Sequence, residues 1–340
     1  MRAFRLLIGA VAVCALSAAV PASAQNVLQL PGGKTVEVIG LEDWTIAMLQ
    51  DSLARHGDGV TLESHACAAV LRERLGFADA AVQSFLLVMD DDTTEYVAVS
   101  VVEPADSARV RRRAVGRDTT GFPAGWEDIG GLMRRNGGVG FALVNRMRRV
   151  PPGLDIDSAA LRHAWAWVDG QQTPEGRAAA VRAVQSHPNL HARILAATLL
   201  RDAPADATVM HALVRALRDD VDMVASMAGQ ALPRMAAARQ GFDWSPVADD
   251  VHALLDGSSL YALDPLLQSL AGSGADARWA SPFLAGGGHA VLARLSAENP
   301  RMRSGAHRLL VALRGEDLGR DPAAWRAWVA SLSPAAGHGR

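Results

Sequence analysis

Apolar residues in the second half of the chain recur every three or four positions, in paired runs separated by short polar turns. The turns lie at Pro188, Asp220, Ser258 and Asn299. The apolar positions after these turns are Ala192, Leu195, Ala196 and Leu199, then Val224, Ala228, Ala231 and Leu232, then Leu263, Leu266, Leu267 and Leu270, and finally Met302, Ala306, Leu309, Leu310 and Leu313. Each stripe alone predicts one amphipathic helix, but four in succession predict an all-helical repeat array over about 155–335.

A related motif opens the second helix of three of these pairs. It reads Asn189-x-x-Ala192-Arg193-x-x-Ala196 and Asn299-x-x-Met302-Arg303-x-x-Ala306, with a weaker copy, Asp220-x-x-x-Val224-Ala225-x-x-Ala228, between them. The third pair departs from the motif and carries Pro265 near the start of its second helix. The pattern resembles the HEAT-like helical repeat family over about 176–314, with end helices at 157–168 and 321–332. The resemblance implies a curved α-solenoid that binds proteins and has no activity of its own.

The segment 35–115 mixes strand-like alternation with helical spacing and predicts a small α+β domain. The expected order is strand, helix, helix, strand, strand, over 35–39, 44–55, 64–75, 82–89 and 95–103. Asp43 is the expected N-cap of the first helix. In the last strand, the outward and inward positions alternate between two sets: Val97, Val99 and Val101, and Tyr96, Ala98 and Ser100. This alternation predicts a strand with one buried face.

Residues 116–154 interrupt the pattern with many glycines and the pair Pro151-Pro152. Weak helical spacing remains at 126–135 and 139–149. Because glycine and proline disfavour long helices, we expect a glycine-rich connector with one or two short helices.

The first 24 residues have the three parts of a secretory signal peptide. Arg2 and Arg5 form the charged start, residues 6–20 the apolar core, and Ala22-Ser23-Ala24 a small-residue cleavage site before Gln25. An uncleaved membrane anchor is the alternative, but the apolar run is short. We therefore expect export to the periplasm or beyond the cell.

Composition narrows the classes of function. The chain has 340 residues and is 49% apolar, enough for one domain followed by a repeat array. Its formal charge of −2 argues against a general nucleic-acid binder, which would show a clear basic excess. No segment after the N-terminus has the length and apolar character of a transmembrane helix. Cys14 follows the bulky Val13, which argues against lipidation, and cleavage would leave only Cys67, so no internal disulfide could form.

Cys67, His65 and His56 come nearest to a nucleophile with a base. His65 and Cys67 are two positions apart on a predicted helix, which places them about 200° apart around its axis. Cys67 also lies in a run of small apolar residues, where a buried thiol is the ordinary case. The spacing therefore disfavours a cysteine-centred site.

Two patterns could suggest a metal. His187 and His191 have i, i+4 spacing, but Pro188 places a turn between them and no third ligand is indicated. Asp90-Asp91-Asp92 lacks the alternating acids and central glycine of a calcium loop, so a solvated hairpin turn is favoured. We assign no metal, cofactor-binding or catalytic residue.

Glycine and arginine clusters suggest anion binding only weakly. Gly130-Gly131 and Gly137-Gly138-x-Gly140 lack the Lys-Ser/Thr of a phosphate loop. Arg111-Arg112-Arg113 and further arginines up to Arg149 make the stretch 109–149 basic. A solvated face that pairs with acidic residues of the repeats or of the Asp90 turn is favoured, and an anionic partner, such as lipid headgroups or an acidic peptide, is the alternative.

These observations favour an exported, non-enzymatic protein–protein interaction protein that holds a protein partner on the concave face of its repeats. An enzyme with a site around Cys67 and His65 is the alternative, and a small-ligand or cell-envelope structural role is a third. Nucleic acid is not an expected partner. The identity of the partner, the oligomeric state and the fold family of 35–115 stay open.

Overall fold

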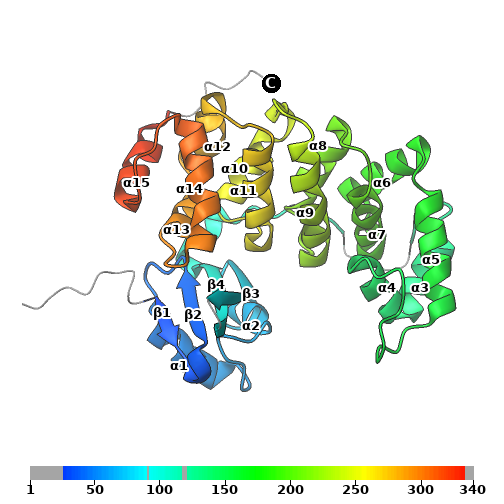
Figure 1. The fold of residues 1–340 in the computed structure, drawn as a ribbon, viewed down its shortest axis with the longest axis horizontal. Helices are drawn as coiled ribbons and strands as arrows, with labels where there is room; N and C mark the ends of the chain where they lie inside the picture. Colours follow the sequence, from blue (N-terminus) through cyan, green and yellow to red (C-terminus); the bar gives the residue numbers. More distant parts are fainter. Residues whose placement is uncertain (1–25, 90–91, 117–120, 334–340) are drawn as a thin grey trace, which may run out of the picture.

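The computed structural model describes residues 26–89, 92–116 and 121–333. A mixed four-stranded sheet with its helices forms the N-terminal part, and many packed helices follow (Figure 1). The sheet lies against the end of the helical part that is nearer the C-terminus. The expected signal peptide and Cys14 lie outside the described residues, as do Asp90 and Asp91 of the acidic turn.

The strands are β1 (Val27–Gln29), β2 (Thr35–Ile39), β3 (Asp79–Met89) and β4 (Asp92–Val102), in the sheet order β1-β2-β4-β3. β1 with β2 and β3 with β4 are antiparallel, whereas β2 and β4 are parallel. A parallel pair needs a crossover, which α1 (Ile46–His56) and α2 (Cys67–Glu73) supply. The predicted order of three strands and two helices is confirmed; β1 was not predicted.

Apolar side chains fill the space between α1, α2 and one face of the sheet. The main contributors are Val36, Val38, Val97, Val99, Val101, Leu49, Leu53, Cys67 and Leu71. The predicted cap of α1 is wrong, because the Thr45 hydroxyl accepts the Met48 N–H at 3.2 Å and is the N-cap. The Asp43 backbone N–H instead donates to the Glu103 carboxylate at 2.9 Å.

The opposite face of the sheet is buried as well, so the prediction of a strand with one buried face is wrong. Only 6% of Tyr96 is exposed, and Ala98 and Ser100 are buried. The turn between α13 (His289–Leu295) and α14 (Pro300–Arg314) covers them. The sequence pattern of β4 could not reveal this cover, because it lies about two hundred positions away in the chain.

The helical part contains the four predicted helix pairs. They are α6 (Pro174–Ser186) with α7 (Leu190–Arg201), α8 (Ala207–Ala216) with α9 (Asp222–Ala237), α10 (Ala248–Asp256) with α11 (Leu263–Gly272), and α13 with α14. The first helices pack in the order α6, α8, α10, α13, and the second helices in the order α7, α9, α11, α14. We call these the first-helix row and the second-helix row; Figure 1 shows them side by side.

Polar side chains cap the starts of α6, α7, α8 and α14, whereas α9, α10, α11 and α13 begin without a side-chain cap. The Asn189 side chain accepts the N–H groups of His191 and Ala192, and Asn299 accepts that of Arg301. Pro265 lies in the first turn of α11, where its missing N–H costs no helical bond. From residue 158 onward, the helices outside the four pairs are α5 (Ser158–Gly170), α12 (Ala280–Leu284), which was not predicted, and α15 (Pro322–Ser331). Short 3-10 turns lie at Pro31–Gly33, Pro104–Arg109, Ser245–Val247, Leu260–Ala262 and Ala277–Trp279.

The glycine-rich segment holds two short helices, α3 (Glu127–Arg135) and α4 (Gly137–Val144). Both share the core of the helical part, and the buried Arg201 of α7 donates to the Val144 carbonyl at 2.8 Å. Gly130 is needed for this packing, because a Cβ there would lie 2.2 Å from the Phe122 ring. Within the described ranges, no helix combines the length and apolar character needed to span a bilayer.

Candidate functional site

The cysteine-centred arrangement is not assembled. The Cys67 side chain is fully buried in α2, whereas His65 and His56 are exposed. Burial, with a smaller contribution from Glu63, raises the pKa of Cys67 to about 12. Since the thiolate is the reactive form, this environment opposes nucleophilic chemistry at Cys67.

In the described ranges, the structure does not bring His187 and His191 together with a third metal ligand. His187 ends α6 while His191 lies in the first turn of α7, and the His187 Nδ1 accepts the Asn189 N–H at 3.1 Å. Burial and the nearby Arg134 lower the pKa of His191. Among the described residues, no three histidine, cysteine or acidic side chains are grouped closely enough to hold a metal ion. The candidate glycines from 130 to 140 lie inside α3 and α4.

Residues 111–116, which we call the arginine strap, run along the turns of three helix pairs. Arg113 donates to the Val184 carbonyl at the end of α6 and to the Asp219 carboxylate before α9, both at 2.9 Å. The Arg111 N–H donates to the Ser258 hydroxyl, after α10, at 2.7 Å. Arg112 donates to Asp79 of the sheet and to Asp222 of α9. Arg112 and Arg113 therefore pair with acids of the repeats, as expected, but only about a fifth of each side chain is exposed, so the expectation of a solvated face is wrong for these two residues.

The arginine of the first repeat motif is structural. Arg193 is fully buried, and its Nε donates to the Asp219 carboxylate at 2.9 Å. Its Nη1 donates to carbonyls of the turn at His187 and Pro188, and to Gly116 of the strap. Arg193 thus ties neighbouring pairs together and offers no charge to a partner.

Polar groups join the sheet to the α13–α14 turn. The Glu37 carboxylate accepts the Tyr96 hydroxyl, the Glu298 N–H at 2.5 Å and the Asn299 N–H at 3.4 Å. Arg294, which is 1% exposed, donates to the Ser100 hydroxyl at 3.2 Å. These bonds are directional, so they fix how the sheet meets the helices.

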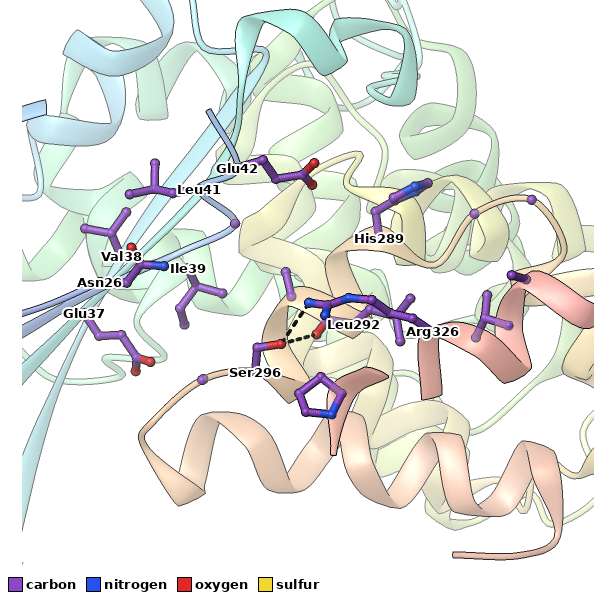
Figure 2. A pocket seen from close by; sticks show the side chains of 18 residues that line it. Asn26, Glu37, Val38, Ile39, Leu41, Glu42, His289, Leu292, Ser296 and Arg326 are labelled. Carbon is purple, nitrogen blue, oxygen red and sulfur yellow. Dashed lines mark hydrogen bonds between the residues drawn. The ribbon is translucent and has the colours of Figure 1, made fainter. Parts of the chain in front are cut away.

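Beside the contact between the sheet and the α13–α14 turn, the sheet and the helical part enclose a cleft of about 680 Å³. One wall is the end of β2 and the loop after it; the other is formed by α13 and α15 (Figure 2). We call it the β2–α15 cleft. Its apolar lining is Val38, Ile39, Leu41, Leu292, Ala293, Ala297, Val329 and Ala330, and its polar side chains are Asn26, Glu37, Glu42, His289, Ser296 and Arg326.

His289 is held by a carboxylate at one end of the cleft. Its Nδ1 is hydrogen-bonded to Asp256, and its backbone N–H donates to the same carboxylate at 3.4 Å. Burial acts to raise the pKa of Asp256, but the bonds from His289, with His252 nearby, outweigh it and hold this pKa below its ordinary value. Glu42 lines the same end of the cleft as His289, and its Oε1 lies 3.6 Å from the Nη2 of Arg109.

Arg326 reaches into the cleft from α15. Its Nη2 donates to the Ser296 hydroxyl at 3.3 Å, and this hydroxyl donates in turn to the Leu292 carbonyl (Figure 2). Within the described part of the chain, no hydrogen bond joins Ser296 to His289. The cleft combines an apolar surface with fixed polar groups, as binding sites do.

No family model and no curated protein matches this chain. What the cleft can bind is therefore inferred from the geometry and chemistry of its lining residues.

Sequence reasoning singled out none of the polar residues of the β2–α15 cleft, because they come from three distant segments: 26–42, 286–297 and 322–330. One local signal was present: three consecutive glycines, 286–288, precede His289. A Cβ at Gly287 would lie 2.8 Å from the His252 ring, and Gly288 has a φ of +80°. These glycines allow the loop to approach His252 and Asp256 closely.

Proposed function

We propose that this chain is an exported, non-enzymatic protein–protein interaction protein whose HEAT-like helical repeats form an α-solenoid. The observation that carries the proposal is the order of packing, in which each helix row continues from α6 and α7 to α13 and α14. Stacked helix pairs of this kind bury their apolar faces against one another and present an extended outer surface. The environment of Cys67 removes the main support of the enzymatic alternative.

The exposed side of α9 is the surface best placed to meet a partner. Along the second-helix row, the sheet covers part of α14, and α3 packs against α7, whose residues from 192 to 201 are all buried. α9 contacts α8 on one side and α7 and α11 on its flanks. Met223, Ser226 and Gln230 stay exposed on the remaining side.

Capture by the whole chain tests this proposal. Residues 25–340 keep every described contact, including the buried Arg294 bonds to the sheet. A partner retained from an envelope extract of the exporting cell would be identified, purified and titrated directly. We expect Ser226→Arg to weaken its binding at least tenfold, because a long charged side chain would then project from the centre of the α9 surface.

Thr208→Arg is the matched control, because Thr208 is exposed on α8 in the first-helix row. Equal weakening by both substitutions, or by neither, would count against a binding surface on α9. Retention of the partner by an unfolded variant would show that capture is non-specific.

A further inference from the structure

We propose that the β2–α15 cleft binds the C-terminal residues of a partner protein, with the terminal carboxylate at Arg326. This inference rests on the proposed function, since it names a second contact that the same partner makes. The cleft has a size typical of ligand sites and is partly open to solvent, so a short chain segment can enter it.

The guanidinium of Arg326 has donors left to bind a carboxylate. Arg326 is exposed, and among the described residues it donates one hydrogen bond, at 3.3 Å, to Ser296. A guanidinium has five N–H donors in a planar fork, and a carboxylate accepts two of them in parallel. The other arginines at the junction differ: Arg294 is buried against Ser100, and Arg109 is paired with Asp106 and Glu42.

The surroundings of Arg326 suit an apolar terminal residue. Leu292, Ala293 and Val329 line the same cleft, from α13 and α15, and Ile39 lines it from β2. They would cover the side chain of a terminal residue whose carboxylate lies at Arg326. The ligand class is therefore a carboxylate on a short apolar body.

The opposite end of the cleft favours a peptide over a small free acid. Glu42 and His289 line that end together. The Glu42 side chain is 61% exposed, and its carboxylate can accept N–H groups, which an extended peptide backbone offers and a fatty acid lacks. Capture of a terminal carboxylate with the preceding residues is an established mode of peptide recognition.

The test is a competition between two peptide pools on immobilised residues 25–340. Both pools contain pentapeptides with apolar residues at the last two positions; one ends in a free carboxylate and the other in an amide. Mass spectrometry of the retained peptides gives their ratio. We expect the free acids to be enriched at least tenfold over the amides.

Arg326→Ala should bring the ratio to about one, whereas Arg320→Ala, exposed in the preceding loop and outside the cleft, should leave it unchanged. Ala330→Trp, at an exposed lining position, should block both pools by filling the cleft. Unchanged thermal midpoints would show that the variants are folded. Equal retention of acids and amides, or tenfold enrichment that survives Arg326→Ala, overturns the proposal.

Free leucine and octanoate distinguish the source of the carboxylate. If either displaces the peptides at an equal concentration, the cleft is a small-acid site and the peptide proposal is wrong. Ser226→Arg should leave the acid-to-amide ratio unchanged. If Ser226→Arg leaves partner capture unchanged while the acid-to-amide ratio is tenfold, the α9 surface fails and the cleft stands. If Ser226→Arg weakens capture while the wild-type ratio is about one, the cleft fails and the α9 surface stands.

Discussion

The two faces of the sheet are both buried, but by different kinds of contact. Towards α1 and α2 the contact is apolar, and Val99 and Leu71 belong to the same buried cluster there. Towards the α13–α14 turn it includes Glu37, Tyr96 and Arg294, all buried and hydrogen-bonded. Apolar packing accepts many arrangements of similar volume, whereas directional bonds fix one arrangement. The apolar face therefore holds α1 and α2 on the sheet, and the polar face determines where the helical part docks on it.

The largest effect is expected at the polar face. Glu37→Ala removes the acceptor of the Tyr96 hydroxyl and of the Glu298 and Asn299 N–H groups. Leaving these buried donors without a partner should lower the free energy of unfolding by about 3–5 kcal/mol. Urea denaturation followed by tryptophan fluorescence measures this change.

Glu37→Gln is the matched control, because it keeps one carbonyl acceptor at the same place. It should cost less than half as much as Glu37→Ala. If the two variants were equally stable, the carboxylate would not be what holds this face, and the contrast between the faces would fail.

The apolar face should respond to lost volume and not to lost bonds. Leu71 is fully buried there, and Leu71→Ala should cost about 2–5 kcal/mol by leaving a cavity. Leu71→Met keeps most of the volume and should cost less than about 1.5 kcal/mol. Denaturation of both variants gives the difference; a loss below about 0.5 kcal/mol for Leu71→Ala, the size of a surface effect, would show that this face is not a packed core.

Alkaline pH should lower the free energy of unfolding through one titrating group on each face of the sheet, Cys67 on the apolar face and Tyr96 on the polar face. Burial raises the pKa of Cys67 from 9.0 to about 12, so the folded chain keeps a proton that the unfolded chain releases. The stability due to this group is present below pH 9 and is lost as the pH rises towards 12, by about 1.4 kcal/mol per pH unit. Burial and the bond to Glu37 also raise the pKa of Tyr96, whose effect begins above roughly pH 10.

Denaturation between pH 7 and pH 11 tests this order. Cys67→Ala should remove the loss that begins near pH 9, and Tyr96→Phe only the later one. A wild-type curve that stays flat up to pH 11 would contradict the burial of both groups.

The smallest effect concerns the start of α1 on the apolar face. Thr45→Ala removes the hydroxyl that accepts the Met48 N–H and should cost about 1 kcal/mol. Asp43→Ala should cost less than half of that, because the Asp43 side chain does not cap the helix. Thermal unfolding of the two variants measures both changes, and a greater loss for Asp43→Ala would restore the cap expected from the sequence.

Sequence reasoning found the elements whose signal is local. The alternation of Val97, Val99 and Val101 gave β4, and the stripes after Pro188 and Asn299 gave α7 and α14. It missed β1 and α12, because three and five residues are too few to show a period. Tyr96 and Ser100 alternate with the valines just as solvent-facing residues would, so their burial could not be foreseen.

The candidate site depended on contacts between distant segments. Nothing near Glu42 in the chain indicates that His289 lies at the same end of a cleft. Cys67, in contrast, was correctly expected to be buried, because its neighbours in the chain are small and apolar. Arg193 stood out in the repeat motif, but its role as a buried tie to Asp219 required the structure.

The arginine strap has a mechanical consequence for the helical part. It is bonded to the end of α6, to Asp219 and to Ser258, and so fixes the separation of three successive turns along one edge. Spreading these turns would break several bonds at once, so this edge is stiff and any elastic bending must occur at the opposite edge. The partner proposed to bind α9 would therefore meet a surface of preset length, and it would have to match that length because it could not stretch the strapped edge.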